Sequence, residues 1–164
     1  MRKHEQEDNT MFIDVSDNLF ATAEALSMKW HTAMNVICKD EYVPAIQVRT
    51  FVQQIRTVHE RVQDFVIYAN TLRRSSIAQQ PPAIVVGVNI YNDSGRILAG
   101  LEELKSFVTR HIAMTDEDDK QFKNILNEID DILLCLMYAG EYLQKGDFRS
   151  ALETLSDAQN PVLE

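Results

Sequence analysis

The chain has 164 residues, 45% of them hydrophobic, and a formal net charge of −9. This length suits one domain with a substantial core, and a content of 5 Gly and 4 Pro suits a mostly helical protein. The acidic balance argues against nucleic acid or an anionic membrane as the main partner, because phosphate groups need a basic surface.

Three features bear on the location of the protein. Residues 1–8 contain no apolar core of a secretory signal. The longest apolar run, Ile132 to Ala139, is too short to cross a bilayer. Cys38 and Cys135 lie inside apolar helical patterns, which predicts buried thiols of a reducing compartment. We therefore expect a cytoplasmic protein with no membrane contact.

The first predicted helix starts near Asp17, with Ser16 as its candidate N-cap, because residues 1–11 are polar and predicted to be disordered. From there apolar residues recur in alternating steps of four and three, the spacing of one buried helical face. This stripe consists of Leu19, Ala23, Leu26, Trp30, Ala33 and Ile37.

A second, longer helix is predicted over residues 45–77. Pro44 suits its first turn, and eight apolar residues then follow in phase with a helical period, which predicts a face turned toward the core. These residues are Val48, Phe51, Ile55, Val58, Val62, Phe65, Ala69 and Leu72. Residues 49–74 also carry five arginines against two acids, which either stay solvated or dock a charged partner.

The helical pattern breaks at Gln79–Pro82, and residues 83–91 form the only β-like stretch, rich in branched side chains. We expect an extended strap over the helices, or a strand that pairs with its copy in a dimer. Extended, residues 80–93 would span about 45 Å, which is about the length of a 30-residue helix. We therefore predict a long crossover that leaves the third helix parallel to the second.

The third helix is predicted from Ser94 or Gly95 to Ala113, and Thr115 with Asp118 has the spacing of a capping box that opens a fourth helix. Around Ile132 to Met137 the fourth helix is apolar on every side, which predicts the central buried segment. The core-facing residues of the third helix are Ile97, Leu101, Leu104, Val108 and Ile112. Those of the fourth helix are Phe122, Ile125, Ile129, Ile132, Leu136, Gly140 and Leu143.

Residues 133–161 carry the most specific pattern in the chain. Gly146 suits the left-handed end of one helix, Asp147 suits the N-cap of the next, and Pro161 would end that second helix. Small residues that let the two helices approach are Ala139, Ala151 and Ala158. The stretch resembles a single tetratricopeptide hairpin, which implies helix packing and partner binding without chemistry. No second copy lies upstream.

Residues that could carry chemistry are sparse. His31, His59 and His111 fall on three different predicted helices, but none has the Glu-x-x-His spacing of a di-iron bundle. The chain has no phosphate-binding glycine loop, nucleophile elbow or paired-cysteine zinc pattern. We therefore expect no catalytic residue, no metal ion and no cofactor, and the sequence does not favour an enzyme.

These patterns predict one all-α domain over residues 1–164: a four-helix bundle with a short fifth C-terminal helix and an extended crossover segment between helices 2 and 3. The expected function is a non-catalytic interaction module, such as an adaptor, a secretion-type chaperone or an assembly subunit, with a protein partner or a homodimer. Two alternatives stay open, namely a sensory or regulatory bundle with a small ligand, and RNA binding through the arginine-rich second helix. The candidate partner-binding residues are Ile84, Val86, Val88, Tyr91, Arg56, Arg61, Arg73 and Arg74.

Overall fold

Helices make up nearly all of the described structure. The computed structural model describes residues 2–39 and 42–159, and these ranges contain no strand. The prediction of an all-α protein is therefore confirmed. The α-helices are α1 (Arg2–Ile37), α2 (Val48–Arg74), α3 (Ala83–His111), α4 (Asp116–Gln144) and α5 (Phe148–Gln159). Single 3-10 turns, Ala45–Gln47 and Ile77–Gln79, lie before and after α2.

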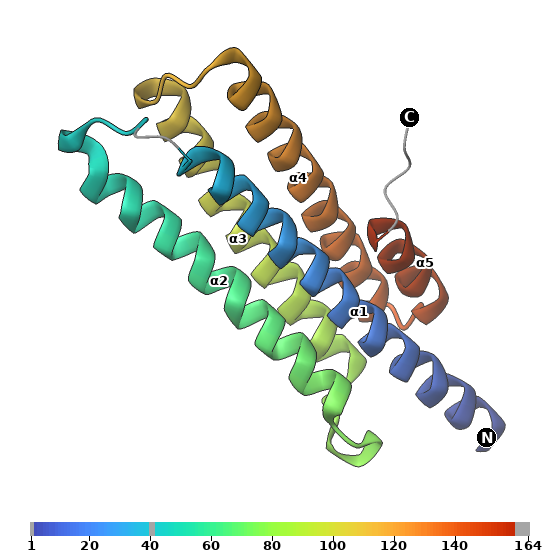
Figure 1. Cartoon of the computed structure of the whole chain (residues 1–164). Coiled ribbons are helices and arrows are strands. Elements are labelled where there is room, and N and C mark those ends of the chain that lie inside the picture. The colour runs from blue at the N-terminus through green and yellow to red at the C-terminus, as the bar shows by residue number, and fades with distance from the viewer. Residues whose placement is uncertain (1, 40–41, 160–164) are drawn as a thin grey trace.

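The four long helices lie side by side, and consecutive helices run in opposite directions (Figure 1). Contacts link α1 to α2, α2 to α3, α3 to α4 and α4 back to α1, whereas the short α5 packs on α1 and α4. The core lies between the long helices, where Trp30, Phe65 and Phe122 are its largest fully buried side chains. None of the described helices is long and apolar enough to cross a membrane.

The predicted apolar stripes do face this core. All six residues of the α1 stripe and all seven of the α4 stripe are buried. In α2 the stripe is buried except for Ile55, which is half-buried, and Val48, which is exposed next to the preceding turn. In α3 the stripe is buried up to Val108, and Ile112 lies just beyond the helix.

The predicted start of the first helix is wrong. α1 already begins at Arg2, so the described residues 2–11 are helical rather than disordered. Ser16 lies inside the helix, where its hydroxyl donates to the carbonyl oxygen of Phe12 at 3.0 Å instead of capping. The physical reason is tertiary, because Phe12 is buried and its ring lies edge-on to the ring of Phe148 in α5, with centroids 6.0 Å apart.

The predicted extended segment is also wrong, because residues 83–91 form the first turns of α3. Val86 and Ile90 are buried in phase with Ile97, so packing outweighs the weak helix propensity of branched residues. The link from α2 to α3 is therefore short. α3 runs antiparallel to α2 (Figure 1), not parallel to it as a long crossover would require.

An unusually close approach joins α3 to α4. A Cβ atom built on Gly87 would lie 2.5 Å from the carbonyl oxygen of Gly140, and one on Gly140 would lie 2.7 Å from that of Gly87. Real Cβ contacts are not this short, so both positions need glycine for the two backbones to meet.

The turn between α4 and α5 has the geometry that the sequence predicts. Gly146 has a φ of 74°, the left-handed conformation that ends a helix. Asp147 then accepts a hydrogen bond from the backbone N–H of Ser150 at 3.1 Å, which caps α5. Thr115 caps α4 in the same way, accepting from the N–H of Asp118 at 3.2 Å. Pro161 lies outside the described residues.

Two predictions of burial fail on exposed faces of the helices. Cys38 is exposed and Cys135 is only half-buried, because Cys38 follows the last residue of α1 and Cys135 lies beside the buried stripe of α4 rather than on it. Leu134 is 43% exposed, so α4 is not buried on all sides near its middle. It contacts α1, α3 and α5, which leaves part of its surface open.

Candidate functional site

A concavity with an apolar floor lies between α1 and α4, beside and beyond the C-terminal end of α5. It consists of two adjoining cavities of about 440 and 280 Å³, which we call the α1–α4 groove. The larger cavity is lined by Ala25, Met28, Lys29, Thr32, Gln121, Asn124, Ile125 and Glu128. The smaller one is lined by Lys29, Glu128, Asp131, Ile132, Cys135, Asp157 and Ala158.

The groove lies where the described residues of α5 no longer cover the α1–α4 face. α5 has 12 residues whereas α4 has 29. Figure 1 shows α5 beside one half of α4, with the other half of the α1–α4 face free of any described helix. The groove therefore continues the furrow in which α5 itself lies.

The seat of α5 shows how a helix fits this face. Its apolar side consists of Ala151, Leu155 and Ala158, all buried. Polar contacts fix its register, because the hydroxyl of Thr22 lies 3.4 Å from the carbonyl oxygen of Leu155, and Gln159 Nε2 donates to Asn18 Oδ1 at 2.9 Å. The α1–α4 face thus accepts an amphipathic helix with small and aliphatic contact residues.

Apolar side chains form the floor of the groove. Ile125 and Ile132 of α4 are 8% and 5% exposed, so their side chains lie deep in it. Met28 of α1 is 71% exposed beside them, which makes it one of the most exposed large apolar side chains among the described residues. An unbranched, flexible Met at the edge of a furrow can adjust its shape to a bound side chain.

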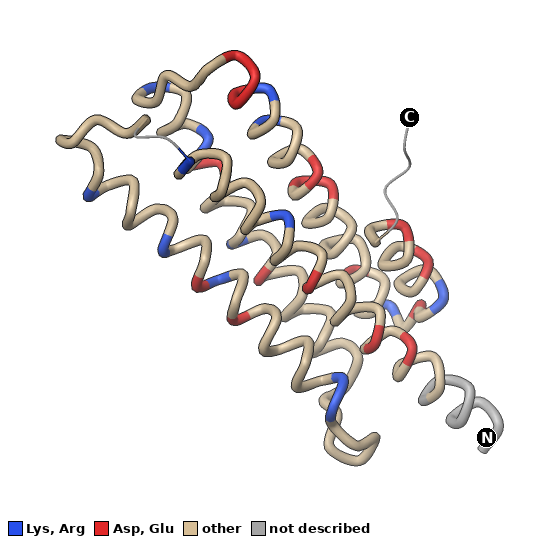
Figure 2. The backbone as a smooth tube through the Cα atoms, viewed as in Figure 1, with Lys and Arg blue, Asp and Glu red and all other residues tan. Residues whose placement is uncertain are grey.

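The walls of the groove are acidic near α5. Lys29 Nζ and Glu128 Oε2 form an ion pair of 2.7 Å that joins α1 to α4 between the two cavities. Asp131 of α4 and Asp157 of α5 both line the smaller cavity. Burial raises the pKa of the Cys135 thiol there, and the negative charges of Asp157 and Asp131 raise it further. Figure 2 shows acidic positions on both α4 and α5.

The apolar residues predicted to bind a partner lie elsewhere, at the start of α3. Ile84 and Val88 are 56% and 39% exposed. Val86, in contrast, is buried in the core, and Tyr91 is half-buried against Gly140 of α4. The helical period thus divides these four side chains between surface and core, and none lines the α1–α4 groove.

The four candidate arginines are spread along α2. Arg56 and Arg74 are exposed, and 18 residues of helix separate them by about 27 Å. Arg61 donates to the carbonyl oxygen of Arg96 at 2.7 Å. Arg73 donates to Asn70 at 3.1 Å, and its guanidinium lies 4.0 Å from the ring centroid of Phe20. Two of the four are therefore engaged in contacts within the chain.

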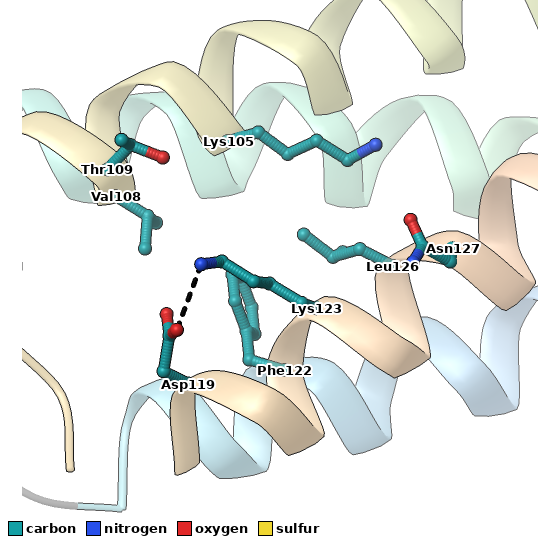
Figure 3. A pocket seen from close by; sticks show the side chains of 8 residues that line it. All are labelled: Lys105, Val108, Thr109, Asp119, Phe122, Lys123, Leu126 and Asn127. Carbon is teal, nitrogen blue, oxygen red and sulfur yellow. Dashed lines mark ion pairs between the residues drawn. The ribbon is translucent and has the colours of Figure 1, made fainter. Parts of the chain in front are cut away.

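A smaller pocket lies between α3 and α4 (Figure 3). Its volume is about 150 Å³, and its lining combines the apolar side chains of Val108, Phe122 and Leu126 with Lys105 and Lys123. Lys123 pairs with Asp119 at 2.9 Å. Partial burial lowers the pKa of Lys105, but hydrogen bonds and charge from Asp130 and Glu102 outweigh it, so the pKa is raised overall.

His31, His59 and His111 do not converge on one site. The rings of His31 and His59 lie edge-on with centroids 5.6 Å apart, whereas His111 lies against Phe107 at 4.8 Å. Within residues 2–39 and 42–159, no group of three or more His, Cys, Asp or Glu side chains is placed to hold a metal ion.

No family model, curated protein or solved structure matches the chain.

The α1–α4 groove was not predicted from the sequence. Its one visible signal is Met28, a large apolar residue outside the buried stripe of α1, but single exposed apolar residues are common on protein surfaces. The groove depends on where α5 ends relative to α4, which no local pattern records.

Proposed function

We propose that this chain is a non-catalytic interaction module, an adaptor, chaperone or assembly subunit built on a four-helix bundle, and that it holds another protein in the α1–α4 groove. The observation that carries the proposal is the groove itself, an apolar furrow that α5 fills over only part of its length. Contacts between helices laid into such furrows are a recurring mode of protein recognition.

The residues around the groove support binding rather than catalysis. Its polar groups are Lys29, Glu128, Asp131 and Asp157, together with the amides of Gln121 and Asn124 and the hydroxyl of Thr32. Lys29 and Glu128 neutralise each other, and the Cys135 thiol has a raised pKa, which makes it a poor nucleophile. An apolar floor with a polar rim is the usual anatomy of a protein interface.

The two alternatives find less support. The α3–α4 pocket of about 150 Å³ is smaller than the ~300–1,000 Å³ that is usual for a small-molecule site. The larger cavity of the groove, about 440 Å³, is within that range, but its lining residues Met28 and Glu128 are 71% and 46% exposed, so it would enclose a small ligand poorly. RNA binding through α2 would need arginines gathered on one surface, whereas two of the four candidates contact groups of the chain itself.

The test is co-purification of the tagged full-length chain from its native host, comparing wild type with Met28→Asp and Ile67→Asp. Both side chains are exposed, at 71% and 62%, but only Met28 lines the groove. We expect a stoichiometric protein partner with wild type and Ile67→Asp, and its loss with Met28→Asp. A bound small molecule without a protein partner, or equal recovery of the partner with both variants, would contradict the proposal.

A further inference from the structure

We propose that the occupant of the α1–α4 groove is a basic amphipathic helix of a partner protein. This inference rests on the proposed interaction function and specifies the chemistry of the partner. Its evidence is the length of the groove, the charge of its walls and the way in which α5 already occupies the same furrow.

The dimensions of the groove suit about four turns of helix. Along α4 it runs from Gln121 to Cys135, which is roughly 21 Å at 1.5 Å per residue. The residues that line its larger cavity come from α1 and α4, whose ribbons lie side by side in Figure 1. A helix lying there would continue the path of α5 and would meet Ala25, Ile125 and Ile132 with its apolar side.

The charges favour a basic helix. Three acids and one lysine line the groove, a net charge of −2. The C-terminal end of α5 adjoins it at Ala158, and the C-terminal end of a helix carries partial negative charge. A lysine or arginine beside Asp131 and Asp157 would therefore meet negative charge from α4 and α5 together.

The ion pair between Lys29 and Glu128 can exchange its cation when a basic helix binds in the groove. Lys29 and Glu128 are 34% and 46% exposed, and such exposed pairs contribute little to stability. A basic residue of the partner can therefore replace Lys29 beside Glu128 at little cost, while Lys29 turns toward solvent. This exchange selects a basic partner, because an acidic helix would separate the pair without offering Glu128 a new cation.

The chain contains a built-in reporter of occupancy. Cys135 lines the groove, whereas the other cysteine, Cys38, lies at the end of α1 and outside it. Partial burial raises the pKa of both thiols, so alkylation is measured in mildly alkaline buffer. A helix bound in the groove covers Cys135 and leaves Cys38 as the internal control.

The probe is a synthetic helical peptide of about three to four turns, with leucines on one face and lysines beside them. A matched peptide carries glutamate in place of every lysine. Binding to the full-length chain is followed by fluorescence anisotropy, and alkylation of each cysteine by mass spectrometry. We expect the basic peptide to bind roughly tenfold more tightly than the acidic one and to slow alkylation of Cys135 alone.

Variants locate the effect. Asp131→Lys should weaken the basic peptide several-fold, whereas Glu60→Lys, the same charge change on the exposed face of α2, should leave its affinity nearly unchanged. Equal weakening by both variants, or binding that leaves Cys135 unprotected, would show non-specific attraction to an acidic protein and overturn the proposal. Protection of Cys135 that grows with protein concentration alone would assign the groove to a second copy of the chain and also overturn it.

The outcome separates this inference from the proposed function. If a native partner is lost with Met28→Asp but neither peptide protects Cys135, the interaction function stands and the basic helix is wrong. If no protein partner exists at all, the interaction function itself fails.

Discussion

The indole Nε1 of Trp30 lies 3.2 Å from the ring Nδ1 of His59, and this hydrogen bond joins α1 to α2. Trp30 is 1% exposed, so water cannot replace His59 as the acceptor. The bond thus gives one of the largest core side chains a fixed orientation, because a buried indole N–H needs a partner.

His59→Phe should therefore destabilise the fold by about 1–3 kcal/mol, the cost of an unsatisfied buried donor. The chain has one tryptophan, so urea unfolding followed by intrinsic fluorescence reports this site directly. The control is His111→Phe, since His111 is exposed and its ring lies against Phe107 of its own helix, with centroids 4.8 Å apart. Equal midpoints for the two variants would show that the Trp30–His59 bond adds nothing.

Substitution of two helical glycines by alanine should have opposite effects on stability, because only Gly140 lies where α3 and α4 meet. Gly140→Ala should destabilise, because the added Cβ would lie 2.7 Å from a backbone oxygen of α3. Gly95→Ala, also inside a helix, has no atom within 4 Å of its Cβ and should stabilise by about 0.5–1 kcal/mol. Thermal unfolding of both variants gives the signs, and a stabilising Gly140→Ala would contradict the close approach.

The positive φ of Gly146 predicts that a residue with a side chain at this position destabilises the fold through backbone strain. Gly146→Val should cost about 1–2 kcal/mol or more, because a branched residue rarely adopts a φ of 74°. Gly95 is again the matched position, since a Cβ at Gly100 would already press on Val58 at 3.0 Å. If Gly146→Val and Gly95→Val shift the unfolding temperature equally, the positive φ is not required.

The middle of α4 offers a comparison of neighbouring leucines. Leu133 and Leu136 are fully buried, whereas Leu134 is 43% exposed. Leu133→Ala and Leu136→Ala should each cost about 2–5 kcal/mol through lost burial and a residual cavity, and Leu134→Ala should cost well under ~1 kcal/mol. Urea midpoints test this ranking, which fails if Leu134→Ala matches the other two.

Asp118 links the start of α4 to the segment that follows α1. Its lowered pKa predicts that the stability of the fold depends on pH. Hydrogen bonds from Tyr42 Oη at 2.5 Å and Lys39 Nζ at 3.1 Å hold its pKa below the usual range. Because the folded pKa is the lower one, the ionised carboxylate stabilises the fold above the unfolded pKa of about 3.9. That contribution is lost as the pH falls through the depressed folded pKa.

Tyr42→Phe should therefore lower the urea midpoint at about pH 7, and the difference from wild type should shrink toward about pH 2, where Asp118 is protonated in both states. A difference that stays constant across this range would attribute the effect to another interaction of the Tyr42 hydroxyl instead.

Sequence reasoning succeeded where the signal is local. The stripe from Leu19 to Ile37 and the left-handed Gly146 follow from spacing and backbone conformation alone, and both agree with the structure. Sequence reasoning failed where contacts between residues far apart in the sequence determine the structure. The branched residues from Ile84 to Val88 favour a strand in isolation, but burial of Val86 and the meeting of Gly87 with Gly140 place them in a helix.

The same limit explains why the start of α1 and the α1–α4 groove were not predicted from the sequence. Polar residues before Phe12 gave no reason to start a helix there, because the partner ring, Phe148, is far away in the sequence. The groove depends on the end of α5 at Gln159 and on its register against Thr22 and Asn18. Local periodicity carries no information about that register.

The contacts between α5 and α1 join parts of the chain that are synthesised far apart in time. Thr22 and Leu155 are 133 residues apart in sequence, and Asn18 and Gln159 are 141 apart. Their contacts cannot form until α5 has been synthesised, so the part of α1 around Asn18 and Thr22 stays uncovered by α5 while residues 23–147 are made. Because contacts of such long separation also slow folding, this part of α1 exposes its apolar residues for longer than a segment that packs on a neighbour in sequence.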